Sequence, residues 1–162
     1  MNRLNFPERT QKWIKRSLED PFVKILLQNS TLTRTQLETL LIDVLAENVA
    51  EKRLKYQDKA EMRLSAVTRG AFNRTLRQSR QNIIRSVYTI LLLGYLGIFE
   101  ETSLNPYLEI ANKLQGYISV YKDVLTSKST NGQRLRIINK LREELEGSLE
   151  HLSHPKALSG KT

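Results

Sequence analysis

The stretch Ala66–Arg85 reads AVTRGAFNRTLRQSRQNIIR and predicts one continuous helix. Thr68 is expected at its N-cap, because a hydroxyl there accepts a hydrogen bond from a free backbone N–H of the first turn. Apolar side chains recur at helical spacing and predict one buried stripe, made of Phe72, Leu76, Ile83 and Val87. The other positions are mainly Arg, Asn and Gln, and no Asp or Glu occurs between Met62 and Phe99.

A helix that carries cations and amides without acids indicates an anionic partner, since a solvated helix usually mixes its charges. Arg, Asn and Gln also have forked polar groups that match the edges of bases. The whole chain has a formal net charge of +9 and a pI near 9.9, which favours a polyanion as partner. We therefore expect duplex DNA to bind this helix through its cations and amides, which are Arg69, Asn73, Arg74, Arg77, Gln78, Arg80, Gln81 and Arg85. The competing interpretation is a basic solvated helix without a ligand.

The composition is that of a folded protein of one domain, or one domain with an appendage. The chain has 162 residues, of which 40% are hydrophobic and 27% charged. It contains no Cys, so disulfides and thiolate metal sites are excluded. No signal peptide is visible, because the first 29 residues are charged throughout and interrupted by Pro7 and Pro21. These features fit a cytoplasmic protein.

The longest apolar run is Val87–Phe99, VYTILLLGYLGIF. A helix needs about 20 apolar residues to span a bilayer, so this run is too short. We expect it to be a buried core helix, with an interfacial membrane anchor as the alternative. A membrane partner is therefore not favoured.

Further helices are expected before and after this stretch. Pro7 and Pro21 suit first helical turns, and Asp20 suits a cap, which predicts helices over 7–18 and 21–28. The first of these carries a basic cluster, Lys12, Lys15 and Arg16, which we expect to be solvated. Thr33 and Gln36 match a capping box that opens a long helix over 34–56. A short helix over 58–64 and a central helix over 69–93 follow, with Gly94 and Gly97 as candidate stops.

The C-terminal part, residues 102–153, predicts an antiparallel hairpin of two helices. One apolar seam is followed by the polar turn 126–132 and a last helix over 133–152. The seam consists of Tyr107, Ala111, Leu114, Ile118, Tyr121 and Leu125. This hairpin is a possible homodimerisation element, and residues 154–162 are expected to be a flexible tail. No stretch alternates with period two, so the sequence predicts an all-α, multi-helix bundle. Residues 1–101 are expected to form its core, with a helix-turn-helix-like unit at about 58–85.

Part of this pattern resembles a known family. Leu32-Thr33 opens a leading helix, Ala60–Met62 reads AEM, Val67–Phe72 reads VTRGAF, and Arg74–Ile83 reads RTLRQSRQNI. In this order the segments resemble the promoter-binding C-terminal domain of sigma factors and related helix-turn-helix regulators. The resemblance covers about residues 32–83. The connection between the two helices holds extra residues, and Gly70 lies inside the second helix instead of in the turn.

The resemblance implies a DNA-binding protein that regulates transcription. It would place Thr68 and Arg69 near a phosphate at the helix start, and Asn73, Arg74, Arg77 and Gln78 in the major groove. Arg80, Gln81 and Arg85 would contact the backbone further along. The alternative is a helical adaptor or RNA-binding protein whose basic helix docks on an acidic protein or on structured RNA.

Catalysis is not expected. The sequence contains no phosphate-binding glycine loop and no nucleophile motif, so we expect neither an enzyme nor a cofactor. The two histidines, His151 and His154, have a spacing that suits one helix face, but they come just before Pro155 without a third ligand cluster. We therefore expect no metal site.

Overall fold

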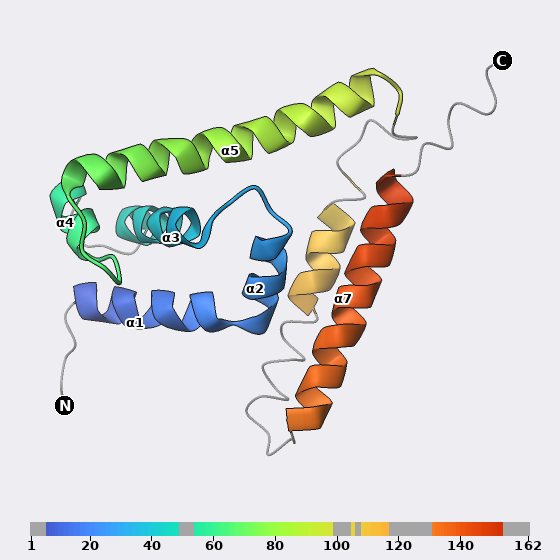
Figure 1. The fold of residues 1–162 in the computed structure, drawn as a ribbon, viewed down its shortest axis with the longest axis horizontal. Helices are drawn as coiled ribbons and strands as arrows, with labels where there is room; N and C mark the ends of the chain where they lie inside the picture. Colours follow the sequence, from blue (N-terminus) through green and yellow to red (C-terminus); the bar gives the residue numbers. More distant parts are fainter. Residues whose placement is uncertain (1–5, 49–53, 99–104, 106–107, 117–130, 154–162) are drawn as a thin grey trace. The chain divides into compact units, whose positions relative to one another are not determined.

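The computed structural model describes residues 6–48, 54–98, 105, 108–116 and 131–153, and these residues form helices and no strand. The all-α, multi-helix prediction is confirmed (Figure 1). The helices are α1 Phe6–Glu19, α2 Pro21–Gln28, α3 Arg34–Asn48, α4 Tyr56–Glu61, α5 Arg69–Tyr95 and α7 Asn131–Ser153, with a further helical segment at 108–116. The chain divides into two compact units, Met1–Val87 and Tyr88–Thr162, and α5 runs through the boundary.

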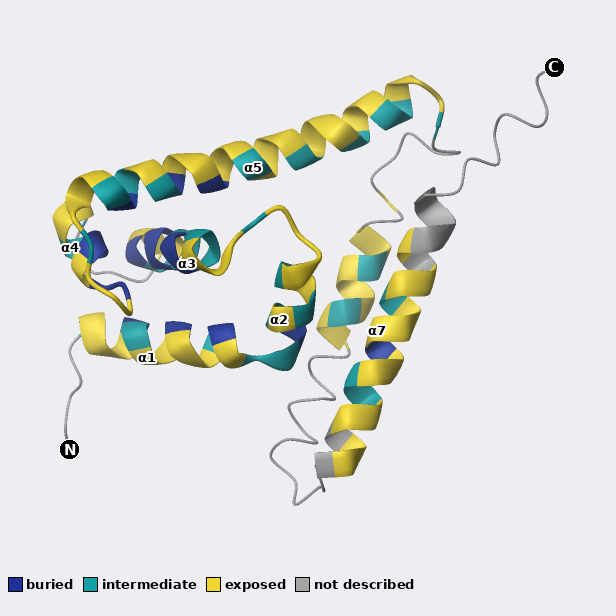
Figure 2. Cartoon of the chain, in the orientation of Figure 1, coloured by how far each residue is buried: buried dark blue, intermediate teal, exposed yellow. Residues whose placement is uncertain are grey.

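The first unit is built around α3, which lies between α1 and the first half of α5 (Figure 1). Its core is apolar: Ile14, Leu18, Ile42, Ala60, Met62, Phe72 and Leu76 are almost fully buried. Each of the helices α1, α3, α4 and α5 contributes to this core, so none of them could bury its apolar face alone. Figure 2 shows the buried residues on the inward sides of these helices.

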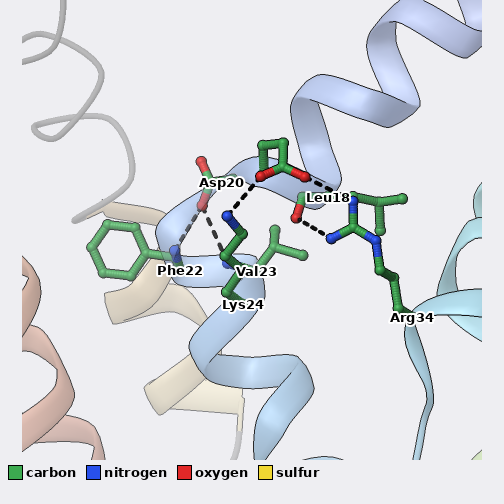
Figure 3. Close-up of polar contacts among 7 residues, drawn as sticks. Leu18, Asp20, Phe22, Val23, Lys24 and Arg34 are labelled. Atoms are coloured by element: carbon green, nitrogen blue, oxygen red, sulfur yellow. Dashed lines mark hydrogen bonds and ion pairs between the residues drawn. The ribbon is translucent and has the colours of Figure 1, made fainter.

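Side-chain caps fix where several of these helices begin. Asp20 accepts hydrogen bonds from the backbone N–H groups of Phe22 at 2.8 Å and Val23 at 3.2 Å, and α2 starts there as predicted (Figure 3). Thr33 and Gln36 exchange reciprocal hydrogen bonds between backbone and side chain, so the predicted capping box is confirmed at the start of α3.

The prediction of one long helix over 34–56 was wrong at its end. Leu54 and Lys55 are not helical, and Tyr56 already belongs to α4. The Asp58 carboxylate accepts a 2.9 Å hydrogen bond from the backbone N–H of Lys55, which caps a new helix at this point. As a result α4 spans Tyr56–Glu61 instead of 58–64.

The predicted end of α5 at about residue 93 is two residues short, and of the two candidate stops Gly97 is confirmed. Gly94 lies within the helix, and the stop is Gly97, whose φ of +70° places it in the left-handed region. Gly97 N–H donates to Gly94 at 3.1 Å and Ile98 N–H donates to Leu93 at 3.0 Å. These two bonds form the Schellman motif that glycine favours at helix ends.

The apolar stripe predicted for α5 holds only in its first half. Phe72 and Leu76 are buried, whereas Ile83 and Val87 are 43% and 45% exposed. The run Val87–Phe99 was expected to be a buried core helix, and for its described residues 87–98 this was wrong, since most of its large side chains are exposed. No helix among the described residues combines the length and the apolar character needed to cross a bilayer.

Only part of the predicted C-terminal hairpin lies in the described residues. The helical segment 108–116 and α7 are present, and α7 buries Leu141 while Leu145 is half-buried. Residues 117–130 fall outside the described part, and with them much of the first predicted seam and the turn. Asn131 and Gly132, which were expected in the turn, belong to α7. The expected tail, 154–162, also lies outside the described residues.

Two buried carboxylates on α3 contact α4, α5 and the connection between these two helices. Asp43 accepts from Lys59 Nζ at 2.7 Å and pairs with an Arg80 guanidinium nitrogen, also at 2.7 Å. Glu38 accepts from the Arg63 guanidinium at 2.9 Å and from the backbone N–H of Leu64 at 2.6 Å. Both carboxylates and their Lys59 and Arg63 partners are less than 10% exposed. Together these contacts join α3 to α4, to the connection that follows α4, and to α5.

A second, exposed set of ion pairs joins α1, α2 and α3. Glu19 contacts Lys24 Nζ at 2.7 Å and an Arg34 guanidinium nitrogen at 2.8 Å, and Arg34 also donates to the Leu18 carbonyl at 3.2 Å. The close-up in Figure 3 shows Lys24 and Arg34 converging on this corner. Hydrogen bonding to Lys24 and then to Arg34 lowers the pKa of Glu19 from 4.5 to about 2.

We predict that Glu19→Gln weakens the dependence of stability on acid pH. Since the folded pKa of Glu19 lies below its unfolded value, its contribution is complete above about pH 4.5 and is lost as pH falls towards about 2. Urea unfolding followed by fluorescence of Trp13, the single tryptophan, should therefore show the largest difference between wild type and variant above pH 4.5. A difference that stays constant down to pH 2 would contradict this account.

We also predict that Asp43→Ala destabilises the first unit by about 3–5 kcal/mol, because Lys59 would be left as a buried charge without its main partner. Arg80→Ala is the matched control. The Arg80 side chain is 53% exposed and Asp43 would keep Lys59, so we expect a cost of only about 1 kcal/mol. Urea unfolding followed by Trp13 fluorescence measures both, and equal losses would count against the buried pair.

Candidate nucleic-acid interface

The candidate interface is the N-terminal half of α5, which begins at Thr68. The Thr68 hydroxyl oxygen accepts a 3.2 Å hydrogen bond from the backbone N–H of Ala71, and its carbonyl accepts from Phe72 at 3.0 Å. Thr68 is therefore the N-cap, as predicted from the sequence. The helix then turns Phe72, Leu76 and Ser79 towards the core.

Both flanks of this buried face are fixed to α3 by polar contacts. On one flank, Arg80 reaches the buried carboxylate of Asp43. On the other flank, the Asn82 amide donates to the Thr31 carbonyl at 2.9 Å and to Gln36 Oε1 at 3.2 Å. The Ser79 hydroxyl donates to the Thr75 carbonyl within α5 at 2.7 Å and lies 3.3 Å from the Gln36 carbonyl. These contacts prevent α5 from rotating about its axis, so its opposite face is held outward.

The outward face is made of the exposed residues Arg74, Arg77, Gln78, Gln81 and Arg85. We call it the basic face. Their spacing of three or four residues places them on the side of the helix opposite Phe72 and Leu76. Within the described ranges of the chain, Arg74 and Arg77 form no hydrogen bond or ion pair. Arg85 is exposed but does interact within the chain.

The remaining predicted residues lie on the flank of α5 that carries Arg80, or at the start of the helix. Arg69 lies about three helical turns before Arg80 on this flank. It lines a hollow of about 510 Å³ together with Leu54, Lys55, Tyr56 and Gln57. Asn73 is half-buried, and Arg80 is engaged with Asp43. The structure thus brings together five of the nine predicted residues on one face and separates Arg69, Asn73 and Arg80 from them.

The sequence reasoning missed the residues that orient the helix. Asp43 stands between apolar neighbours in the segment LLIDVLA, and this isolated acid within an apolar helix was an available signal of a buried ion pair. Asn82 belongs to the amide-rich stretch but serves as a docking residue against α3. Its partners, Thr31 and Gln36, lie more than forty residues away, so no local pattern indicated this role.

The other sequence features give no second site. The basic cluster of α1, Lys12, Lys15 and Arg16, is exposed, and α1 lies on the other side of α3 from α5 (Figure 1). Among the described residues no group of three or more His, Asp or Glu side chains is placed to hold a metal ion. The pair His151 and His154 lies outside the side chains that the structure describes.

The connection between α4 and α5 runs from Met62 to Thr68, which is longer than the three- or four-residue turn of a typical helix-turn-helix. The segments that carry the resemblance to sigma-factor domains fall at the start of α3, at the end of α4 and in α5, and the resemblance itself stays a prediction. No protein-family model, curated protein sequence or solved structure matches this chain.

Proposed function

We propose that this protein binds duplex DNA through the basic face of α5 and acts as a regulator of transcription. One observation carries the proposal. Arg74 and Arg77 are exposed on a helix face that the polar contacts to α3 and to Thr31 hold outward, and no partner is found for them in the described part of the chain. Guanidinium groups held in this way are available to an external anion.

The shape of the face fits a groove. An α-helix fits the major groove of B-DNA, which is about 12 Å wide, and the early turns of the helix reach the base edges. Arg74, Arg77 and Gln78 lie in the second and third turns of α5. Their forked side chains are of the kind that reads guanine and adenine edges. We assign base contacts to these three residues.

Contacts to the phosphate backbone are assigned to the start of α5 and to the C-terminal end of the basic face. Free backbone N–H groups and the helix dipole at Thr68 and Arg69 favour a phosphate at the helix start. Gln81 and Arg85 lie further along the same outward face and are assigned to backbone contacts. Arg80 is reassigned: it positions α5 through Asp43 instead of contacting DNA directly.

Electrostatics supports duplex DNA over an uncharged partner. The net charge of +9 attracts a polyanion, and the stretch Met62–Phe99 contains no acid that would compete for the arginines. The two carboxylates that contact α5 and the connection before it, Asp43 and Glu38, are buried and already paired. Binding should therefore weaken steeply as salt rises, because each phosphate contact releases counterions.

We predict that the double variant Arg74→Ala/Arg77→Ala binds a fluorescein-labelled duplex at least about tenfold more weakly than wild type, since each arginine contact contributes about 1–3 kcal/mol. Because both arginines are assigned to base edges, the variant should also discriminate less between duplexes of different sequence, whereas a phosphate contact would instead lower the slope of log affinity against log salt by about 1. Fluorescence anisotropy over a salt series and with duplexes of different sequence measures these quantities.

Arg136→Ala/Lys140→Ala is the matched control, because it also removes two exposed cations but from α7. It should leave both affinity and slope close to wild type. Unaltered binding by the Arg74/Arg77 variant, or the absence of duplex binding by wild type, would overturn the proposal. Tighter binding of structured RNA than of duplex DNA would favour the RNA-binding alternative.

A further inference from the structure

Beyond the basic turns, the outward face of α5 becomes apolar. Tyr88, Leu91, Leu92 and Tyr95 are 67%, 56%, 56% and 89% exposed, and we call them the apolar patch. They recur at intervals of three and four residues, so they share one side of the helix. Figure 2 shows the exposed residues along the C-terminal half of α5.

This patch is large enough to form an interface. A fully exposed aromatic or large aliphatic side chain presents roughly 200 Å², so the patch and the adjoining Leu96, which is 58% exposed, offer on the order of 600 Å². The largest apolar patch of a typical monomer covers about 300–600 Å² and is often functional. Specific protein interfaces begin at roughly 600 Å² per partner.

We propose that the apolar patch is the contact surface of a homodimer in which two copies of α5 pair antiparallel. A two-fold interface requires a surface that is complementary to itself, and an uncharged patch meets this requirement. The steps of three and four between Tyr88, Leu91 or Leu92, and Tyr95 are those of a helix–helix seam. The two-fold axis would pass between Leu91 and Leu92, at the middle of the patch.

Charge fixes the direction of the pairing. In a parallel pair the two copies of Arg85 would face each other across helices whose axes lie about 8–10 Å apart. In the antiparallel pair they lie about 20 Å apart along the axis, which exceeds the screening length of about 8 Å at physiological salt. Arg74 and Arg77 are still further from the axis, so the basic faces of both copies stay open.

The first test is the oligomeric state of the full chain by sedimentation velocity over a concentration series. We expect wild type to shift from monomer to dimer as concentration rises, and Leu91→Glu/Leu92→Glu to remain monomeric. Val44→Glu is the matched control, because Val44 is 53% exposed on α3, outside the patch. It should dimerise like wild type, and circular dichroism should show equal helix content in all three proteins.

The second test distinguishes the direction of pairing by single cysteines, which is clean because the chain contains none. Leu91→Cys lies next to the proposed axis and should form a disulfide-linked dimer on mild oxidation. Ile84→Cys occupies the same position one heptad earlier and is similarly exposed. In an antiparallel pair its two copies lie about 22 Å apart along the axis, too far for a disulfide, which needs Cα atoms within about 7 Å.

Several results would overturn the proposal. A wild-type chain that stays monomeric at all concentrations would do so. The patch would then be covered by another surface, either the chain's own C-terminal helices or lipid, and flotation with anionic vesicles would identify lipid. Equal cross-linking of Leu91→Cys and Ile84→Cys would show parallel pairing and reject the arrangement. Neither test uses DNA, so a failure of the proposed DNA binding would leave this inference standing.

Discussion

The architecture of the first unit depends on the Asp43 carboxylate. It is buried at the centre of α3 and holds Lys59 of α4 and Arg80 of α5 at the same distance of 2.7 Å. A buried carboxylate requires such partners, since its desolvation otherwise costs several kcal/mol. This requirement ties both α4 and α5 to α3. The Arg80 contact fixes one flank of α5, and the Asn82 contacts to Thr31 and Gln36 fix the other, so the basic face is held outward from both sides.

The buried carboxylate of Glu38 is a second contact between α3 and the segment that follows α4. It holds Arg63 and the Leu64 N–H in the connection between α4 and α5, where no regular structure satisfies the backbone. The connection is longer than that of a typical helix-turn-helix, and the Glu38 carboxylate anchors part of it to α3. The buried acid therefore holds in place a connection that is too long to be a tight turn.

The sequence predicted the features that are set locally. Thr68, Asp20 and the Thr33–Gln36 box were identified as caps because their partners lie within three residues. The all-α class followed from helical periodicity in the same way.

The features that the sequence missed depend on contacts that spacing does not show. The end of α3 was missed because the Asp58 carboxylate caps a new helix at Lys55, and the apolar pattern gives no sign of that cap. The exposure of Ile83 and Val87 was missed because spacing shows which residues share a face but not how far the covering helix extends. Arg80 was placed with the DNA-binding residues because its partner, Asp43, lies 37 residues earlier in the chain.

The Asp43 carboxylate, which Lys59 and Arg80 share, also limits which substitutions the chain can accept. A neutral residue at position 43 leaves Lys59 without its main counter-ion, and an apolar residue at position 59 leaves Asp43 dependent on Arg80 alone. Replacing both by apolar side chains of similar volume removes both costs at once. A double substitution at positions 43 and 59 should therefore be tolerated better than either single one, while substitution of Arg80 should cost less.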